Sequence, residues 1–172
     1  MEDDKLTTNR LELEQILVRQ FLLMQEMFTL SKKERDSLLN ESDLILKIVE
    51  DKEALLDRMS ILEDNCRKVV QGISLTLELH TEDTSIQELL PHFNSEEASR
   101  LRNLSEGISN LAAQIRELNR ANQALALSKL EWLQATQAFL VSIFQPNTDG
   151  YGTQKAGNKH PEATGLGVEF RI

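Results

Sequence analysis

Cysteine, aromatic residues and helix-breaking residues are all scarce in this 172-residue chain. The single cysteine, Cys66, excludes an intramolecular disulfide framework and a thiolate metal cluster, and it suits a reducing compartment. The chain has only three prolines and seven glycines, and most of them follow Gln145. Aromatic residues make up 5%, whereas Leu, Glu, Ala and Gln are abundant. Because straight-chain residues lose little rotamer freedom in a helix, this composition predicts an all-α protein.

Positive charge is also in short supply, since the formal net charge is -9. A nucleic-acid binder needs a basic face to neutralise phosphates, so this class is disfavoured, and so is docking on anionic lipid. No run of about 18 consecutive apolar residues occurs, and we therefore expect no membrane insertion. The start, MEDDKLTTNR, is acidic and polar and does not have the pattern of a secretory signal. We expect a cytoplasmic protein.

Residues that carry catalytic chemistry are sparse and scattered. His80, His92 and His160 lie in different segments, and the sequence has no HExxH motif, no Cys/His cluster and no glycine-rich phosphate loop. Cys66 falls on an apolar seam, where a small buried thiol is the ordinary interpretation. We therefore expect no enzymatic activity, no cofactor and no metal site.

Hydrophobic residues recur at steps of three and four through most of the chain, which indicates helices. The spacing predicts helices over about 8–39, 43–79 and 96–144. Together they predict an elongated antiparallel three-helix bundle or coiled coil over residues 1–145. The remainder, residues 146–172, is rich in Gly, Lys, Thr and Asn without periodicity, and we expect a flexible C-terminal tail.

The second predicted helix carries a heptad-like seam, typical of long helices packed at a small angle. Lys52 interrupts this seam and is expected either to extend its ammonium group outward or to pair with an acid on a neighbouring helix. The apolar members of the seam are Ile45, Ile48, Leu55, Met59, Leu62, Cys66, Val69 and Ile73.

The stretch Leu118–Ile143 is the most unusual part of the chain. It has helical spacing, carries only three charged residues and is apolar over more of its circumference than one partner helix covers. One interpretation is a buried core helix, and the other is a docking surface for another protein. Trp132 and Phe139 favour docking, because they lie seven apart where Leu is usual and aromatic residues are preferred interface anchors.

Two further features leave alternatives open. Asn122 lies on the seam of the last helix, one turn after Asn119. It is either a polar residue that sets the register of the helices or an amide that binds the backbone of a docked segment. Tyr151, the only tyrosine, is either incidental or the anchor of a short linear contact.

Three stretches, in order, resemble the FlgN-type flagellar export chaperones. They are the leucine-rich segment DLILKIVEDKEALLDRM, the segment LNRANQALALSKLEWL on the last helix, and GYGTQKAG after it. The likeness spans about Leu11 to Gly157. It implies a small cytoplasmic helical chaperone that binds the C-terminal segments of the two hook-filament junction proteins, prevents their premature assembly and delivers them to the export gate.

The resemblance also implies roles for residues. Asn119, Asn122 and Leu125 match the family pattern, and Tyr151 matches a tail tyrosine presented to the export gate. The predicted client-binding set continues along the apolar face with Leu130, Trp132, Leu133, Phe139, Leu140, Ile143 and Phe144. The alternative is a structural coiled-coil protein that homodimerises through its last helix, and the chaperone itself could be a homodimer when it is free of client.

Overall fold

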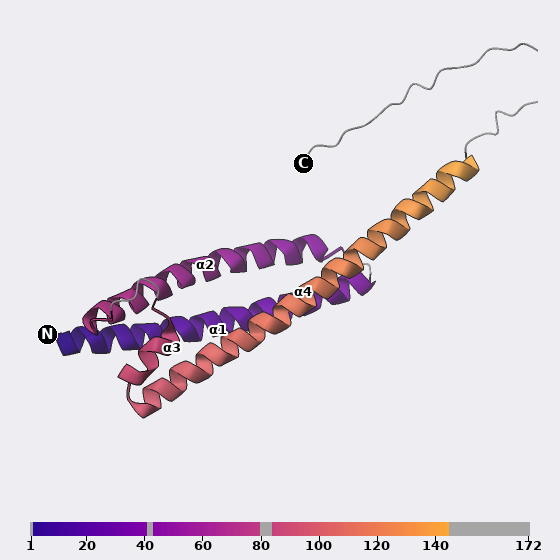
Figure 1. The fold of residues 1–172 in the computed structure, drawn as a ribbon. Coiled ribbons are helices and arrows are strands. Elements are labelled where there is room, and N and C mark those ends of the chain that lie inside the picture. The colour runs from indigo at the N-terminus through magenta and orange to yellow at the C-terminus, as the bar shows by residue number, and fades with distance from the viewer. Residues whose placement is uncertain (1, 41–42, 80–83, 145–172) are drawn as a thin grey trace, which may run out of the picture. The chain divides into compact units, whose positions relative to one another are not determined.

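The computed structural model describes residues 2–40, 43–79 and 84–144, with side chains from Leu6 onward. Within these ranges the chain is helical and has no strand, so the all-α prediction is confirmed. The elements in chain order (Figure 1) are α1 (Glu2–Asn40), α2 (Ile45–Thr76), the single turn α3 (Ile86–Leu89), the 3-10 helix η1 (Leu90–His92) and α4 (Ser95–Phe144). The predicted tail, residues 146–172, lies outside the described residues.

Helix α2 ends at Thr76, three residues earlier than predicted, because the chain closes in a Schellman motif. Glu78 has a left-handed φ of 55°, and its N–H donates to the carbonyl of Leu75 at 3.3 Å. The N–H of Leu79 reaches back to the carbonyl of Ser74 at 3.0 Å. A glutamate in the glycine position gives no sequence signal for this stop, so the periodicity alone extended the helix too far.

The short connector between α2 and α4 is held by two helix caps. Ser85 and Glu88 form a reciprocal capping box at the start of α3. At the start of α4, the side-chain oxygen of Asn94 accepts a hydrogen bond from the N–H of Glu97 at 2.9 Å. Glu96 and Glu97 lie in the first turn of α4, near the positive end of its dipole. These caps direct the chain into the long last helix.

The chain divides into two compact units, residues 1–133 and 134–172. In the first unit, α1 and α2 run antiparallel, and the first 39 residues of α4 run parallel to α1 (Figure 1). In the second unit, residues 134–144 are the last turns of α4. The boundary between the units therefore falls within helix α4.

Two hydrophobic clusters fix the helix order in the first unit. In one, Leu13 and Leu17 of α1 pack with Ile73 of α2 and Leu101 of α4. The connector closes this cluster with Leu89, Leu90 and Phe93. The second cluster joins Leu23 and Met27 of α1 to Leu55 of α2 and Ile115 of α4. The pairing of early α1 with late α2 confirms the antiparallel bundle.

Gly107 of α4 allows a close approach between α4 and α1. A Cβ atom at this position would lie 2.9 Å from the ring of Phe21, which is shorter than an ordinary van der Waals contact. A glycine in the middle of a helix costs about 1 kcal/mol relative to alanine. Here that cost is offset by the contact between the Phe21 ring and the α4 backbone.

Candidate protein-binding surface of helix α4

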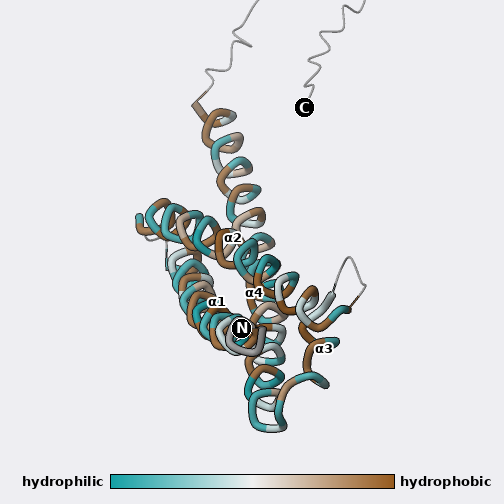
Figure 2. Tube along the Cα trace, turned by 90° about the vertical axis from the view of Figure 1, so that its left-hand side faces the viewer, coloured by the Kyte–Doolittle hydropathy of each residue, from teal (hydrophilic) through white to brown (hydrophobic). Residues whose placement is uncertain are grey.

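The burial of α4 changes after Asn122. Leu101, Ile115 and Asn122 are its buried residues, and none of its described residues beyond Asn122 is buried. Hydrophobic positions nevertheless recur along the helix to its end at Phe144 (Figure 2). The second half of α4 is therefore apolar and exposed, and the core-helix interpretation does not hold for its described side chains.

In the first unit, the apolar side chains of this part of α4 lie on two adjoining faces. Leu125 and Trp132 are seven residues apart, so they share one face, with Leu125 half-buried and Trp132 63% exposed. Leu127, Leu130 and Leu133 follow one another at three-residue steps and are each more than half exposed. Three leucines and a tryptophan thus meet solvent within seven residues.

In the second unit, the described helical turns carry five exposed large apolar side chains. Phe139 and Ile143 are four residues apart on one face, and Leu140 and Phe144 repeat that spacing on the next. Phe139 is 63% exposed and Phe144 is 78% exposed. Val141 is exposed as well. No charged residue occurs between Gln134 and Phe144, so the polar side chains of these turns are all uncharged.

We call this set of side chains the α4 apolar surface. It contains every predicted client-binding residue except the two asparagines, together with two residues that the sequence analysis left out of the set, Leu127 and Val141. Their signal was already present, because both lie among the closely spaced apolar residues of the same helix. The members are Leu125, Leu127, Leu130, Trp132 and Leu133 in the first unit, and Phe139, Leu140, Val141, Ile143 and Phe144 in the second.

The two asparagines lie inside the bundle, in a polar network of five side chains. The amide nitrogen of Asn122 donates to the carbonyl of Ser31 and to a carboxylate oxygen of Glu34, each at 2.8 Å. The side-chain oxygen of Asn119 accepts from the Ser31 hydroxyl and from the Lys52 ammonium, each at 3.0 Å. Lys52 also pairs with Glu34 at 2.8 Å.

This network bears on two alternatives that the sequence left open. Asn122 is 3% exposed and its amide is held by α1, which favours the register-setting interpretation over contact with a docked segment. Lys52 pairs with Glu34 on the neighbouring helix α1, which is one of the two environments expected for it. The network therefore joins α1, α2 and α4 just before the exposed half of α4.

Sequence reasoning missed the α1 side of this network. Met27, Ser31, Glu34 and Ser37 are spaced by four, three and three residues, so they continue the core seam of α1 with polar side chains. Ser31 is fully buried and Ser37 nearly so. A polar interruption at core spacing was the available signal for a buried polar layer.

The described part of the chain offers no group of three or more metal-ligating acidic, histidine or cysteine side chains. Cys66 is half-buried, and burial, followed by the nearby Glu63 carboxylate, raises the pKa of its thiol. A raised pKa lowers the fraction of reactive thiolate at neutral pH. None of the described helices is long and apolar enough to cross a membrane.

The fold and the exposed half of α4 define an all-α helical bundle that presents an apolar helix. The chain matches the family model described as FlgN protein over residues 9–159, and it belongs to this family. The sequence resemblance is thereby confirmed, and membership implies a chaperone role in flagellar export. Comparisons with curated proteins and with solved structures gave no match.

Proposed function

We propose that this protein is a cytoplasmic export chaperone for the hook-filament junction proteins. It binds their C-terminal helical segments, prevents their premature assembly and delivers them to the export gate. The observation that carries the proposal is the α4 apolar surface, a run of exposed apolar side chains on a helix that has buried residues only up to Asn122. An amphipathic client helix laid along this surface would bury apolar area on both partners.

The chemistry of the surface suits transient protection of a client. Contiguous exposed apolar side chains are an aggregation liability in a free protein, so they mark an interaction surface. Trp132 and Phe139 are the expected anchors, because large aromatic side chains supply much contact area for few rotatable bonds. The absence of charge from Gln134 to Phe144 leaves binding to apolar contacts, which tolerate more than one client sequence.

The residues of the predicted site divide into two roles. Asn119 and Asn122 position α4 against α1 and α2. In this proposal, the family pattern at these two positions sets the register between the helices. The side chains proposed to contact the client are Leu125, Leu130, Trp132, Leu133, Phe139, Leu140, Ile143 and Phe144.

Calorimetric titration with synthetic C-terminal peptides of the two junction proteins tests the proposal. We expect at least one peptide to bind with a dissociation constant of about 10 μM or below, equivalent to roughly -7 kcal/mol. Burial of apolar surface should also give a negative heat-capacity change, which titrations at several temperatures measure. If neither peptide binds at about 100 μM protein, the client assignment is wrong.

The same exposed surface fits a second function, a structural protein that homodimerises through α4. Sedimentation across a dilution series separates the two. A client-free dimer that dissociates when the client peptide is added supports the chaperone, because partner and client then compete for one surface. A dimer that persists with client bound at a different face supports the structural protein.

Tyr151 lies outside the described residues, and its proposed role rests on the family resemblance alone. We propose that it contacts the export gate. Tyr151→Ala should leave thermal unfolding and client affinity unchanged while reducing secretion of the junction proteins. Tyr151→Phe is the matched control, since it retains the ring. A loss of client affinity in Tyr151→Ala would assign this residue to client binding instead.

A further inference from the structure

The turns of α4 in the second unit present large apolar side chains when no client is bound. Phe139, Leu140, Ile143 and Phe144 are each about half exposed or more, and Leu140 is the least exposed of them at 48%. No charged residue occurs among residues 134–144. Because contiguous exposed apolar side chains favour association, a chain segment that covers them would stabilise the client-free protein.

A later stretch of the sequence has a pattern that suits this surface. In LGVEFRI, residues 166–172, apolar residues occupy every second position, and Gly, Glu and Arg lie between them. In an extended chain successive side chains point to opposite sides, so this spacing places four apolar side chains on one side. Glycine at positions 165 and 167 disfavours a helix. These residues lie outside the described residues, and the extended segment is an expectation from the sequence.

The lengths of the segment and of the sequence that links it to α4 match the surface. Residues 134–144 extend for about 15 Å at ~1.5 Å per residue, and an extended segment of residues 166–172 spans about 20 Å. Residues 145–165 connect the two, and a Gly-rich polar chain of this length has a root-mean-square end-to-end distance of about 25 Å. A linker that matches its span holds the segment near the surface at an effective concentration in the millimolar range.

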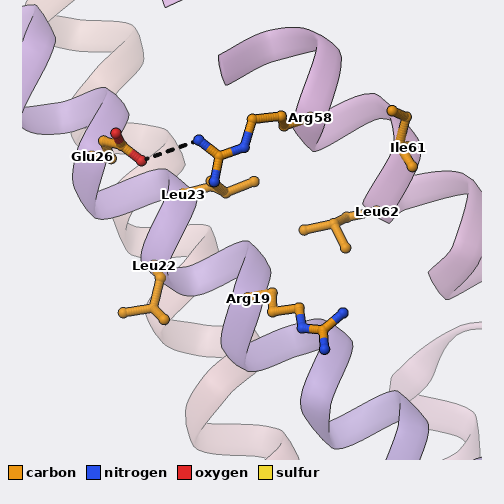
Figure 3. A pocket seen from close by; sticks show the side chains of 7 residues that line it. All are labelled: Arg19, Leu22, Leu23, Glu26, Arg58, Ile61 and Leu62. Carbon is orange, nitrogen blue, oxygen red and sulfur yellow. Dashed lines mark ion pairs between the residues drawn. The ribbon is translucent and has the colours of Figure 1, made fainter. Parts of the chain in front are cut away.

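The depression between α1 and α2 in the first unit suits this segment less well (Figure 3). It has a volume of about 370 Å³, and apolar side chains of both helices line it. Three of its seven lining residues are charged, namely Arg19, Glu26 and Arg58. An apolar segment laid over them would remove charged groups from water, which costs free energy. The uncharged turns of residues 134–144 impose no such cost.

We infer that residues 166–172 dock on the α4 apolar surface of the second unit in the client-free chain, and that they compete with the client for it. Phe170 is the expected anchor, because it is the one aromatic residue of the segment. The docking depends only on the segment and the surface. Its role in limiting client access rests on the function proposed above for α4.

Paramagnetic broadening in the full chain tests the docking without a client. In a Cys66→Ser background, a nitroxide attached at Ala163→Cys should broaden the amide signals of residues 134–144. Phe170→Ser should reduce this broadening about threefold, because it removes the anchor that holds the label near α4. Glu169→Ser is the matched control, since Glu169 lies on the other side of an extended segment, and it should leave the broadening unchanged. Unchanged broadening in Phe170→Ser, or an equal loss in Glu169→Ser, would overturn the inference.

Two further measurements locate the docked segment. Leu22→Ser, in the depression of Figure 3, should leave the broadening of residues 134–144 unchanged. A loss of broadening in this variant would move the segment to that depression and overturn the inference. A mixture of nitroxide-labelled chains and separate isotope-enriched chains should show no broadening of these residues. Broadening in the mixture would assign the docking to a second copy of the chain, which also overturns the inference.

Calorimetry with the junction-protein peptides tests the competition. Phe170→Ser should tighten client binding about threefold, which corresponds to a segment docked in about two thirds of client-free chains. Glu169→Ser should leave the client affinity unchanged. Unchanged or weaker client binding in Phe170→Ser would overturn the competition. If neither peptide binds but Phe170→Ser still reduces the broadening, the client assignment fails and the docking stands.

Discussion

Trp132→Ala and Phe139→Ala should each weaken binding of the junction-protein peptide by about tenfold or more, without lowering the helical content of the protein. Each aromatic side chain is 63% exposed in the client-free chain, so truncation removes little intramolecular packing. In the complex the same truncation removes an anchor, a loss of about 2 kcal/mol or more at an interface hot spot. Calorimetry measures the affinity, and far-ultraviolet circular dichroism measures the helicity.

Leu75→Ala is the matched control for these two substitutions. Leu75 is 78% exposed on α2 and is not part of the α4 apolar surface, so its truncation should change neither client affinity nor helicity. If Trp132→Ala and Phe139→Ala collapse the fold, their side chains are core and the α4 apolar surface is not a binding site. An unchanged affinity in both variants would remove them from the client site.

Lys52→Met should lower the free energy of unfolding by about 2–3 kcal/mol. The substitution removes the cation that pairs with Glu34 at 2.8 Å, where the two side chains are 16% and 18% exposed. The Glu34 carboxylate is then left half-buried with one amide donor, and Asn119 loses one of its two donors. Urea unfolding measures the change in the free energy of unfolding. An unchanged slope of this free energy against urea concentration shows that the denatured state is the same.

Lys47→Met is the matched control on the same helix. Lys47 pairs with Asp51 at 3.1 Å but is 68% exposed, so its loss should change stability by no more than about 0.5 kcal/mol. Adding Glu34→Gln to Lys52→Met should recover part of the loss, because it removes the uncompensated charge. Equal effects at Lys47 and Lys52 would show that the network does not hold the three helices in register.

The helices themselves were predictable from the sequence because their hydrophobic positions recur at three and four. The seam through Leu55 and Ile73 correctly placed these residues in the core. Helix boundaries were less predictable where no residue type marks them. The stop after Thr76 depends on Glu78, which has a left-handed backbone conformation. Two backbone hydrogen bonds stabilise this turn, from the N–H of Glu78 to the carbonyl of Leu75 and from the N–H of Leu79 to the carbonyl of Ser74.

The polar members of the seams could be located from the sequence, but their partners could not. The spacing identified Lys52 and Asn122 as interruptions, yet each had two acceptable environments. The choice depends on Ser31 and Glu34, which lie more than 80 residues from Asn122 in the chain and come beside it only when α1 and α4 pack. Such a choice is made by tertiary packing, which a pattern within one helix does not contain.

The excess of apolar residues after Asn122 was visible in the sequence, but exposure was not. The same spacing would serve a core helix with three neighbours. What distinguishes the two cases is that burial of α4 stops at Asn122, while exposed apolar residues continue from Leu127 to Phe144. The match to the FlgN family implies a chaperone role, and the proposed use of α4 rests on this exposure.

Hydrogen exchange of the full chain, with and without a junction-protein peptide, tests the use of α4 most directly. Without client, amides in residues 130–144 should exchange faster than those in residues 101–118, because few buried contacts hold that part of the helix. A saturating peptide should slow exchange in residues 130–144 by about tenfold or more and leave residues 101–118 unchanged. Protection confined to α1 and α2, or slow exchange of residues 130–144 in a client-free monomer, would contradict the proposal.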